Sequence, residues 1–269
     1  MQLGILMAGE GIGAVGAIGV LRALRRKGIG VHAVCGMDAG AYPAALWACG
    51  MSENEMESCA CVWAEKGNRL FEGHFFRAGE ALFSGRAMAR MLHAQTRGLA
   101  LRDCERRVAF VCMAVPGRRT VVFSPQQLDD NQRVWTDHAP IFFAARAAMA
   151  TPPLWRCANF VGIPLCAHPD VREGIRALRS MGATQVLAVY PAYVRSAPKT
   201  PLDILAWEKT VMLDAATLNI CRARIELNEM ITPTDDDALA CIRAGERCGM
   251  RLERAVLEAR NGRVLMLRR

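Results

Sequence analysis

Two glycine-rich turns, each placed after a short apolar run, decide the predicted fold. Residues 3–16 read LGILMAGEGIGAVG, and residues 30–40 read GVHAVCGMDAG. Each apolar run is typical of a buried parallel strand. The first turn leads into apolar residues at helical spacing, and the second leads into a small-residue helix over 41–49. Strand, turn and helix repeated twice predict the beginning of a doubly wound α/β fold.

The remaining sequence continues this pattern without a repeat, a low-complexity segment or a linker. We therefore expect one α/β domain over residues 1–269, with a mostly parallel central sheet flanked by helices. In chain order, we next expect a helix that a capping box at Ser52 opens and that runs towards Lys66, and then a hairpin of strands 108–115 and 120–123. A helix over 141–150, a helix over 175–181 and a strand over 185–190 follow. Two helices end the chain, and the last of them is opened by residues 234–237 and interrupted at Gly249.

Composition and charge narrow the class of protein. Of the 269 residues 52% are hydrophobic and 22% are charged, which favours a folded globular protein over a disordered one. The 34 Lys and Arg residues against 26 Asp and Glu residues give a net charge of +8, which favours anionic partners such as phospholipid headgroups. No block of Lys and Arg has interleaved aromatic residues, so we do not expect nucleic-acid binding.

Cysteine usage predicts the compartment. The 11 cysteines are an odd number, and Cys59-Ala60-Cys61 has no second pair to complete a metal site. We expect neither a metal nor a cofactor. No apolar run reaches the roughly 18 residues needed to cross a bilayer, and the sequence begins on an apolar strand instead of a basic region with a cleavage site. The sequence therefore predicts a reduced, cytoplasmic protein without a transmembrane segment.

The first turn literally satisfies a dinucleotide-binding pattern. Gly11, Gly13 and Gly16 form G-x-G-x-x-G after a strand and before a helix, where backbone N–H groups can approach a pyrophosphate. An acidic residue should then end the second strand and hold the ribose. Asp38 is the candidate, although it lies beyond Gly36 in a turn that leads straight into a helix. A nucleotide-binding protein is therefore one alternative.

The second turn has a different interpretation. Gly36-Met37-Asp38-Ala39-Gly40 has the frame G-x-S-x-G of a nucleophile elbow, with aspartate at the nucleophile position. Gly36 and Gly40 allow a strained strand-to-helix turn that holds the middle side chain at a helix N-terminus. The first turn would then offer backbone N–H groups to an oxyanion beside it.

Taken together, these stretches resemble the patatin-like phospholipase family over most of the chain. Residues 6–21 are similar to the family's first strand, G-G-G-x-[RK]-G oxyanion loop and first helix, and residues 31–40 to its second strand and elbow. Three further segments resemble the family in the same order, namely ALFSG at 81–85, RAAMATPPLW at 146–155 and RSMGATQVLAV at 179–189.

The resemblance implies a Ser–Asp dyad, from which this sequence departs. Asp38 stands at the serine position. Counting from the two flanking segments puts the family aspartate, which belongs to a D-G-G/A motif, at Ala167 or at Cys166. His168, the next residue, is the candidate for a replacement base. Asp170 is expected to be a solvated loop residue.

The oxyanion loop departs as well. The family's three glycines fall on Gly9, Glu10 and Gly11, and its basic residue falls on Gly13. A glutamate there would place negative charge where an oxyanion must develop.

Three parts of the catalytic machinery therefore depart together. We expect a catalytically impaired pseudoenzyme of patatin-like fold that binds an acyl lipid, an anionic membrane surface or a protein partner. The alternative is an active acyl-ester hydrolase of the lipase and phospholipase class in lipid metabolism, or a hydrolase that uses Asp38 as a carboxylate nucleophile with His168 as its base. Attack by the Asp38 carboxylate on an ester would yield an anhydride, which disfavours the hydrolase with a carboxylate nucleophile.

Overall fold

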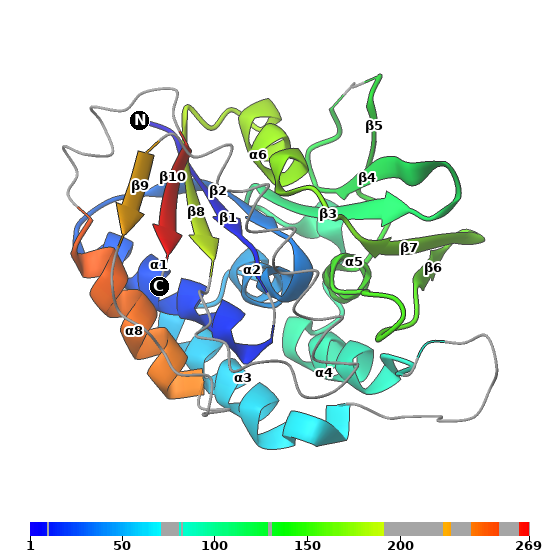
Figure 1. Ribbon diagram of the computed structural model, residues 1–269, viewed down its shortest axis with the longest axis horizontal. Helices are drawn as coiled ribbons and strands as arrows, with labels where there is room; N and C mark the ends of the chain where they lie inside the picture. Colours follow the sequence, from blue (N-terminus) through cyan, green and yellow to red (C-terminus); the bar gives the residue numbers. More distant parts are fainter. Residues whose placement is uncertain are drawn as a thin grey trace.

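A ten-stranded sheet runs through the middle of the molecule, with helices on both faces (Figure 1). The computed structural model describes residues 1–9, 11–70, 81, 83–128, 131–190, 223–226, 238–252 and 264–268. The strands are β1 (Leu3–Met7), β2 (Val31–Gly36), β3 (Val108–Ala114), β4 (Arg119–Phe123), β5 (Arg133–Thr136), β6 (Ala158–Phe160), β7 (Ile163–Ala167), β8 (Gln185–Tyr190), β9 (Ala223–Glu226) and β10 (Val264–Arg268).

The main path of the sheet has the order β5-β4-β3-β2-β1-β8-β10-β9. Its pairs are parallel except for β3–β4, and the additional strands β7 and β6 join antiparallel to β3 and to each other. β1 pairs with β2 in parallel, with Ile5 opposite Val34. The predicted mostly parallel α/β sheet, the parallel first two strands and the hairpin of β3 with β4 are therefore confirmed.

The helices form two layers of unequal size. They are α1 (Gly16–Arg26), α2 (Ala41–Ala48), α3 (Glu53–Lys66), α4 (Arg86–Thr96), α5 (Ile141–Ala148), α6 (Val171–Ser180) and α8 (Ala238–Met250). Helix α6 covers one face, where its apolar residues pack with Leu6 and Met37. The other helices share the larger core on the opposite face with Ile5 and Val34. This division follows from the alternation of side chains along buried strands.

Local capping signals explain where two helices begin. Ser52 accepts a hydrogen bond from the Glu55 backbone N–H, and the Glu55 carboxylate accepts one from the Ser52 N–H, which confirms the predicted capping box. Asp170 caps α6 by accepting a hydrogen bond from the Arg172 N–H. Helix α6 therefore begins at Val171, a turn earlier than its apolar spacing predicted.

Close packing of α1 on α8 depends on glycine. A Cβ atom on Gly19 would lie 1.9 Å from the Ile242 carbonyl oxygen, and one on Gly245 would lie 1.9 Å from the Gly16 oxygen. Gly249 belongs to the same contact, because a Cβ there would lie 2.6 Å from the Ala23 Cβ. The prediction that Gly249 interrupts the last helix is therefore wrong, since α8 continues to Met250. The predicted start of that helix, 234–237, lies outside the described residues.

Candidate functional site

Asp38 lies at a sharp turn between the carboxyl end of β2 and helix α2. Met37 is extended, Asp38 has a positive φ of 49°, and a single 3-10 turn over Asp38–Gly40 precedes Ala41. A left-handed φ is uncommon for a residue with a Cβ and is often found at functional sites. The aspartate is only 4% exposed. This is the strand-to-helix elbow that the sequence predicted.

The glycines of the elbow permit a close approach of three backbone segments. A Cβ on Gly40 would lie 2.2 Å from the Met7 carbonyl oxygen, and one on Gly36 would lie 2.6 Å from the Ala41 Cα. The Met37 N–H donates to the Met7 carbonyl at 2.9 Å, and the Ala39 N–H donates to the Gly9 carbonyl at 2.9 Å. The first glycine-rich turn and the elbow are therefore fixed side by side at one edge of the sheet.

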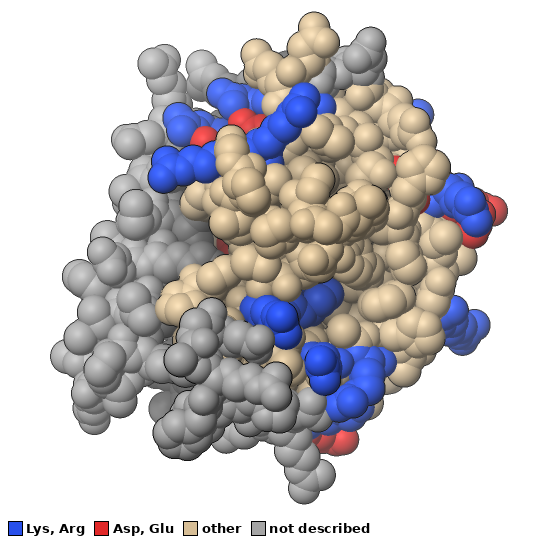
Figure 2. Space-filling model, turned by 90° about the vertical axis from the view of Figure 1, so that its right-hand side faces the viewer, with Lys and Arg blue, Asp and Glu red and all other residues tan. Residues whose placement is uncertain are grey.

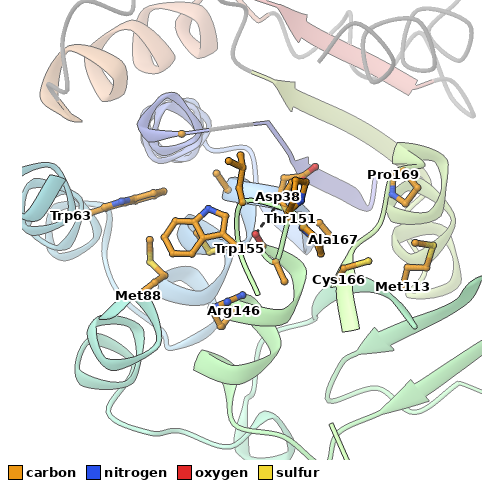
Figure 3. Close-up of a pocket in the computed structure, with 17 residues that line it drawn as sticks. Asp38, Trp63, Met88, Met113, Arg146, Thr151, Trp155, Cys166, Ala167 and Pro169 are labelled. Carbon is orange, nitrogen blue, oxygen red and sulfur yellow. Dashed lines mark hydrogen bonds between the residues drawn. The ribbon is translucent and has the colours of Figure 1, made fainter. Parts of the chain in front are cut away.

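A cavity of about 480 Å³ opens beside the elbow and reaches Asp38 (Figure 3). Among the described residues that line it, Asp38 and Arg146 are the charged ones. Its larger apolar lining residues are Trp63, Met88, Met113, Met149, Leu154 and Trp155. The size and lining are typical of a site for an apolar small molecule.

The position predicted for the dyad aspartate lies on the wall of the same cavity. Ala167 and Cys166 both line it, and both belong to β7, whose pairing with β3 sets Ala167 opposite Cys112 and Cys166 opposite Met113. In Figure 3, Cys166 lies towards Met113 and Ala167 lies nearer to Asp38. A methyl group and a thiol thus line the cavity at the two positions that the sequence predicted for the dyad aspartate.

His168 is buried, at 8% exposure, and is not among the residues that line the cavity. Its Nδ1 accepts a hydrogen bond from the Asp170 N–H at 3.1 Å, so Nε2 carries the proton and donates to Thr120 Oγ1 at 3.1 Å. Burial lowers the pKa of His168 below its ordinary value. Both ring nitrogens therefore already have protein partners.

Asp170 is a capping residue and an ion-pair partner. Its carboxylate binds the Arg172 side chain at 2.8 Å. Burial alone would raise the pKa of Asp170, but the bonds from Arg172 outweigh it and lower that pKa. The expectation of a merely solvated loop residue is replaced by a role in starting α6.

The first turn lies partly in the cavity wall. Gly9 and Gly11 have positive φ values of 115° and 59°, and Gly11 lines the cavity. Gly13 and Gly16 are buried, and Gly16 packs against α8. A pyrophosphate would have to contact this backbone, so the burial disfavours the nucleotide interpretation. Glu10 lies outside the described residues, and the effect of its charge stays a prediction.

Arg146 is the functional candidate that the sequence reasoning missed. It lies on α5, is 6% exposed and lines the cavity. Its Nε donates to the Gly85 carbonyl at 3.3 Å, and its Nη2 donates to the carbonyls of Ser84 at 3.4 Å and Arg156 at 2.7 Å. The signal available in the sequence was a lone arginine inside the otherwise apolar helix IFFAARAA.

Neither a metal-binding cluster nor a membrane-spanning helix is found among the described residues. No described group of three or more His, Cys, Asp or Glu side chains is arranged to hold a metal ion. None of the helices in the described part of the chain has the length and apolar character to span a membrane.

The family follows from a match to a family model. The model for patatin-like phospholipase matches residues 6–171, which is more than half of the chain and includes the first turn, the elbow and β7. The chain therefore belongs to the patatin-like phospholipase family, and its α/β sheet has the patatin-like fold. No curated protein matches the sequence significantly.

Three solved structures that match this chain have low sequence identity and TM-scores below 0.5. VipD from Legionella pneumophila is 13% identical at a TM-score of 0.48, over 96% of this chain and 67% of that one. A complex of SpcU with ExoU from the type III secretion system of Pseudomonas aeruginosa gives 15% identity and a TM-score of 0.43, over 80% of this chain. The type III effector protein ExoU gives 14% identity and 0.40, over 93% of this chain. This chain spans 50% and 52% of the latter two chains.

Proposed function

We propose that this protein has lost the serine acyl-hydrolase chemistry of its family and keeps the cavity beside the elbow as a binding site for an acyl lipid. The observation that carries this proposal is the apolar cavity that ends at Asp38. Binding an acyl chain there removes apolar surface from water, at about 25 cal/mol for each Å². No hydroxyl stands at the elbow to form an acyl-enzyme.

The second position of the dyad supports the same conclusion. A general base must lie within hydrogen-bond reach of the group that it activates. Ala167 has no titratable group, and a thiol at Cys166 lies towards Met113. A water molecule, or a serine introduced at position 38, would therefore have no carboxylate base on β7 to activate it.

A hydrolase with Asp38 as nucleophile is the second candidate, and the left-handed elbow favours it. That reaction needs a base to hydrolyse the covalent intermediate. His168 would have to give up its bond to Thr120 or to the Asp170 N–H before it could act. The geometry therefore supports binding better than turnover.

Turnover of p-nitrophenyl acyl esters and phospholipids tests the proposal. Wild-type protein should release product at a marginal rate, and Asp38→Asn should leave that rate unchanged. Asp38→Ser alone should also add little, because a serine without a base stays a weak nucleophile. The combination of Asp38→Ser, Ala167→Asp and Glu10→Gly should restore measurable hydrolysis, and Cys166→Asp in place of Ala167→Asp is the matched control. Robust wild-type turnover that Asp38→Asn abolishes would instead establish the carboxylate nucleophile.

We also propose that the lipid is taken from an anionic membrane surface. The hairpin of β6 with β7 meets the β3–β4 turn through a hydrogen bond from the Val115 N–H to the Pro164 carbonyl at 3.0 Å. They carry the exposed apolar residues Val115 (46%), Val161 (87%) and Ile163 (47%). Figure 2 faces this side and shows a broad uncharged area with Lys and Arg at its margins. A protein partner at the same surface is the competing outcome.

The extent of the domain and the location of the protein are further proposals. β1 pairs with β8, and β8 pairs with β10, so one sheet continues beyond the matched residues 6–171. This continuity supports one domain over residues 1–269. The cytoplasmic location depends on the cysteine content of the sequence and stays a prediction.

A further inference from the structure

The guanidinium of Arg146 is a buried cation that has no anionic partner among the described residues. Its Nε and Nη2 bind backbone carbonyls, and its Nη1 has no hydrogen-bond partner in the part of the chain that the structure describes. None of the ion pairs among the described residues includes it. The indole of Trp155 lies 5.7 Å from its Cζ and supplies only a weak cation–π contact.

Such a group is unfavourable in an apolar cavity. Buried charges in proteins are nearly always paired, because removal from water is costly for an ion. Burial lowers the pKa of Arg146 to about 10, so the side chain is still protonated at neutral pH. Carbonyl dipoles stabilise the cation in part, but they leave its positive charge uncompensated and the buried Nη1 without a hydrogen bond. A ligand that brought a negative charge into the cavity would supply the missing partner.

We propose that Arg146 is the head-group site of this cavity and binds the carboxylate or phosphate oxyanion of a single-chain amphiphile. The chain of that amphiphile lies along the apolar lining residues such as Met88 and Trp155. This inference rests on the proposed function, since it names the head group of the acyl ligand. Guanidinium suits this role because it stays charged at neutral pH and Nη1 can still donate to an oxygen of a carboxylate or phosphate.

The position of Asp38 predicts in which orientation the ligand lies in the cavity. Asp38 and Arg146 come from different elements, the elbow and α5, and lie at separate places on the cavity wall (Figure 3). A carboxylate at Asp38 repels an anionic head group, whereas Arg146 attracts it. The oxyanion therefore lies at the α5 side of the cavity, away from the elbow.

A purely structural role for Arg146 is the competing explanation. The side chain ties the turn at Ser84–Gly85 to the carbonyl of Arg156 and thereby closes one side of the cavity. A structural tie affects ligands of every charge equally, whereas a head-group site distinguishes an anion from a neutral molecule of the same length. The charge of the ligand therefore separates the two roles.

Calorimetric titration of wild-type protein with decanoate, decyl phosphate and 1-decanol provides the first test. Both anions should bind about tenfold to a hundredfold more tightly than the alcohol, as expected for a hydrogen-bonded charge pair. The relative affinity of the two anions tells which oxyanion the site prefers. Equal affinity for all three would overturn the head-group site and leave acyl binding intact. Absence of binding by all three would overturn acyl binding itself. If inorganic phosphate binds as tightly as decyl phosphate, the proposed contribution of the ligand's alkyl chain is overturned.

Substitution of Arg146 provides the second test. Arg146→Met should abolish the preference for anions and leave the affinity for 1-decanol within about threefold. Arg102→Met, which removes an exposed arginine, is the matched control and should keep the preference. An anion preference that persists in Arg146→Met would overturn the assignment. If Arg146→Met does not fold by circular dichroism, Arg146→Lys decides, because one ammonium nitrogen cannot replace the carbonyl bonds of Nε and Nη2 and also serve the ligand as Nη1 would. That variant should lose about threefold to tenfold of the preference, and an unchanged preference would overturn the assignment.

Discussion

Asp38 keeps a left-handed backbone although it is not a glycine, and its surroundings explain how. The Ala39 N–H is bound to the Gly9 carbonyl, and Gly40 packs directly on the end of β1. A conformation of this kind costs on the order of 1–3 kcal/mol and persists only where neighbouring contacts enforce it. The elbow therefore keeps its shape through the glycine beside it and does not depend on the chemistry of residue 38.

Replacement of Gly40 tests this dependence. Gly40→Ala should lower the free energy of unfolding by about 2 kcal/mol or more, because the new methyl group overlaps the Met7 carbonyl at 2.2 Å. Gly30→Ala is the matched control, since a Cβ there meets nothing within 4 Å. Urea denaturation of the two variants gives the comparison. Equal stability of the two would mean that β1 and α2 do not hold the elbow.

The residues of the site differed in how far the sequence could predict them. Asp38 was predictable because a strand, two glycines and a helix are all local signals. Ala167 and Cys166 could not be separated by counting, because their directions depend on how β7 pairs with the distant strand β3. Arg146 was missed because its burial arises from contacts with Ser84, Gly85 and Arg156, which no periodicity along α5 reveals.

At the scale of elements, the beginning of α6 joins several strands through polar groups. Glu173 forms an ion pair of 2.5 Å with Arg133 of β5, and both side chains are less than a tenth exposed. Burial would raise the pKa of Glu173, but Arg133 and Arg176 outweigh it and lower that pKa. Two residues before the cap of α6, His168 binds Thr120 of β4. These contacts fix α6 and β7 against the antiparallel side of the sheet.

This arrangement predicts a loss of stability in mild acid. The pKa of His168 is lowered by burial in the folded protein, so the unfolded chain takes up the proton first as the pH falls below about 6.5. The free energy of unfolding should therefore fall between about pH 7 and pH 5, above the range in which Glu173 contributes. In His168→Gln this slope should be smaller, while the exposed His138→Gln should keep it. Denaturant titrations at several pH values measure the slope, and an identical slope in wild type and His168→Gln would contradict the interpretation.

The elements themselves were predicted unevenly for a physical reason. β1, β2, β3, β4 and β8 contain apolar runs next to clear turn signals, and all were predicted. β5 and β6 have only four and three residues, and β7 contains a proline and pairs with β3, which is distant in sequence, so no local pattern identified them. The error at Gly249 has the opposite cause, because a residue that usually ends a helix serves here to bring α8 close to α1.

At the scale of the whole molecule, the exposed turns lie next to the strand that lines the cavity. β7 carries Ile163 near its exposed end and Cys166 and Ala167 at the cavity. The adjacent β3–β4 turn adds Arg118 and Arg119, which are exposed and form no ion pair among the described residues. Apolar tips beside cations suit the interface of a membrane with anionic lipids.

Vesicle flotation tests the membrane surface. Wild-type protein should bind phosphatidylglycerol vesicles better than phosphatidylcholine vesicles, and binding should weaken with added salt. The double substitution Val161→Asp and Ile163→Asp should reduce binding by about tenfold or more, because both residues would bring charge into the interface. Val62→Asp, at another exposed valine, is the control and should bind as wild type does. Absence of wild-type binding to either vesicle would favour a protein partner at this surface.

β10 has an interior place in the sheet although it follows every other described strand in the chain. It pairs with β8 on one side and with β9 on the other, and among the described strands β9 has no other partner. A ribosome releases the chain from its N-terminus, so β9 emerges before the strand that has to receive it. During synthesis the backbone of β9 therefore stays without its partner strand until residues 264–268 have emerged and paired with β8.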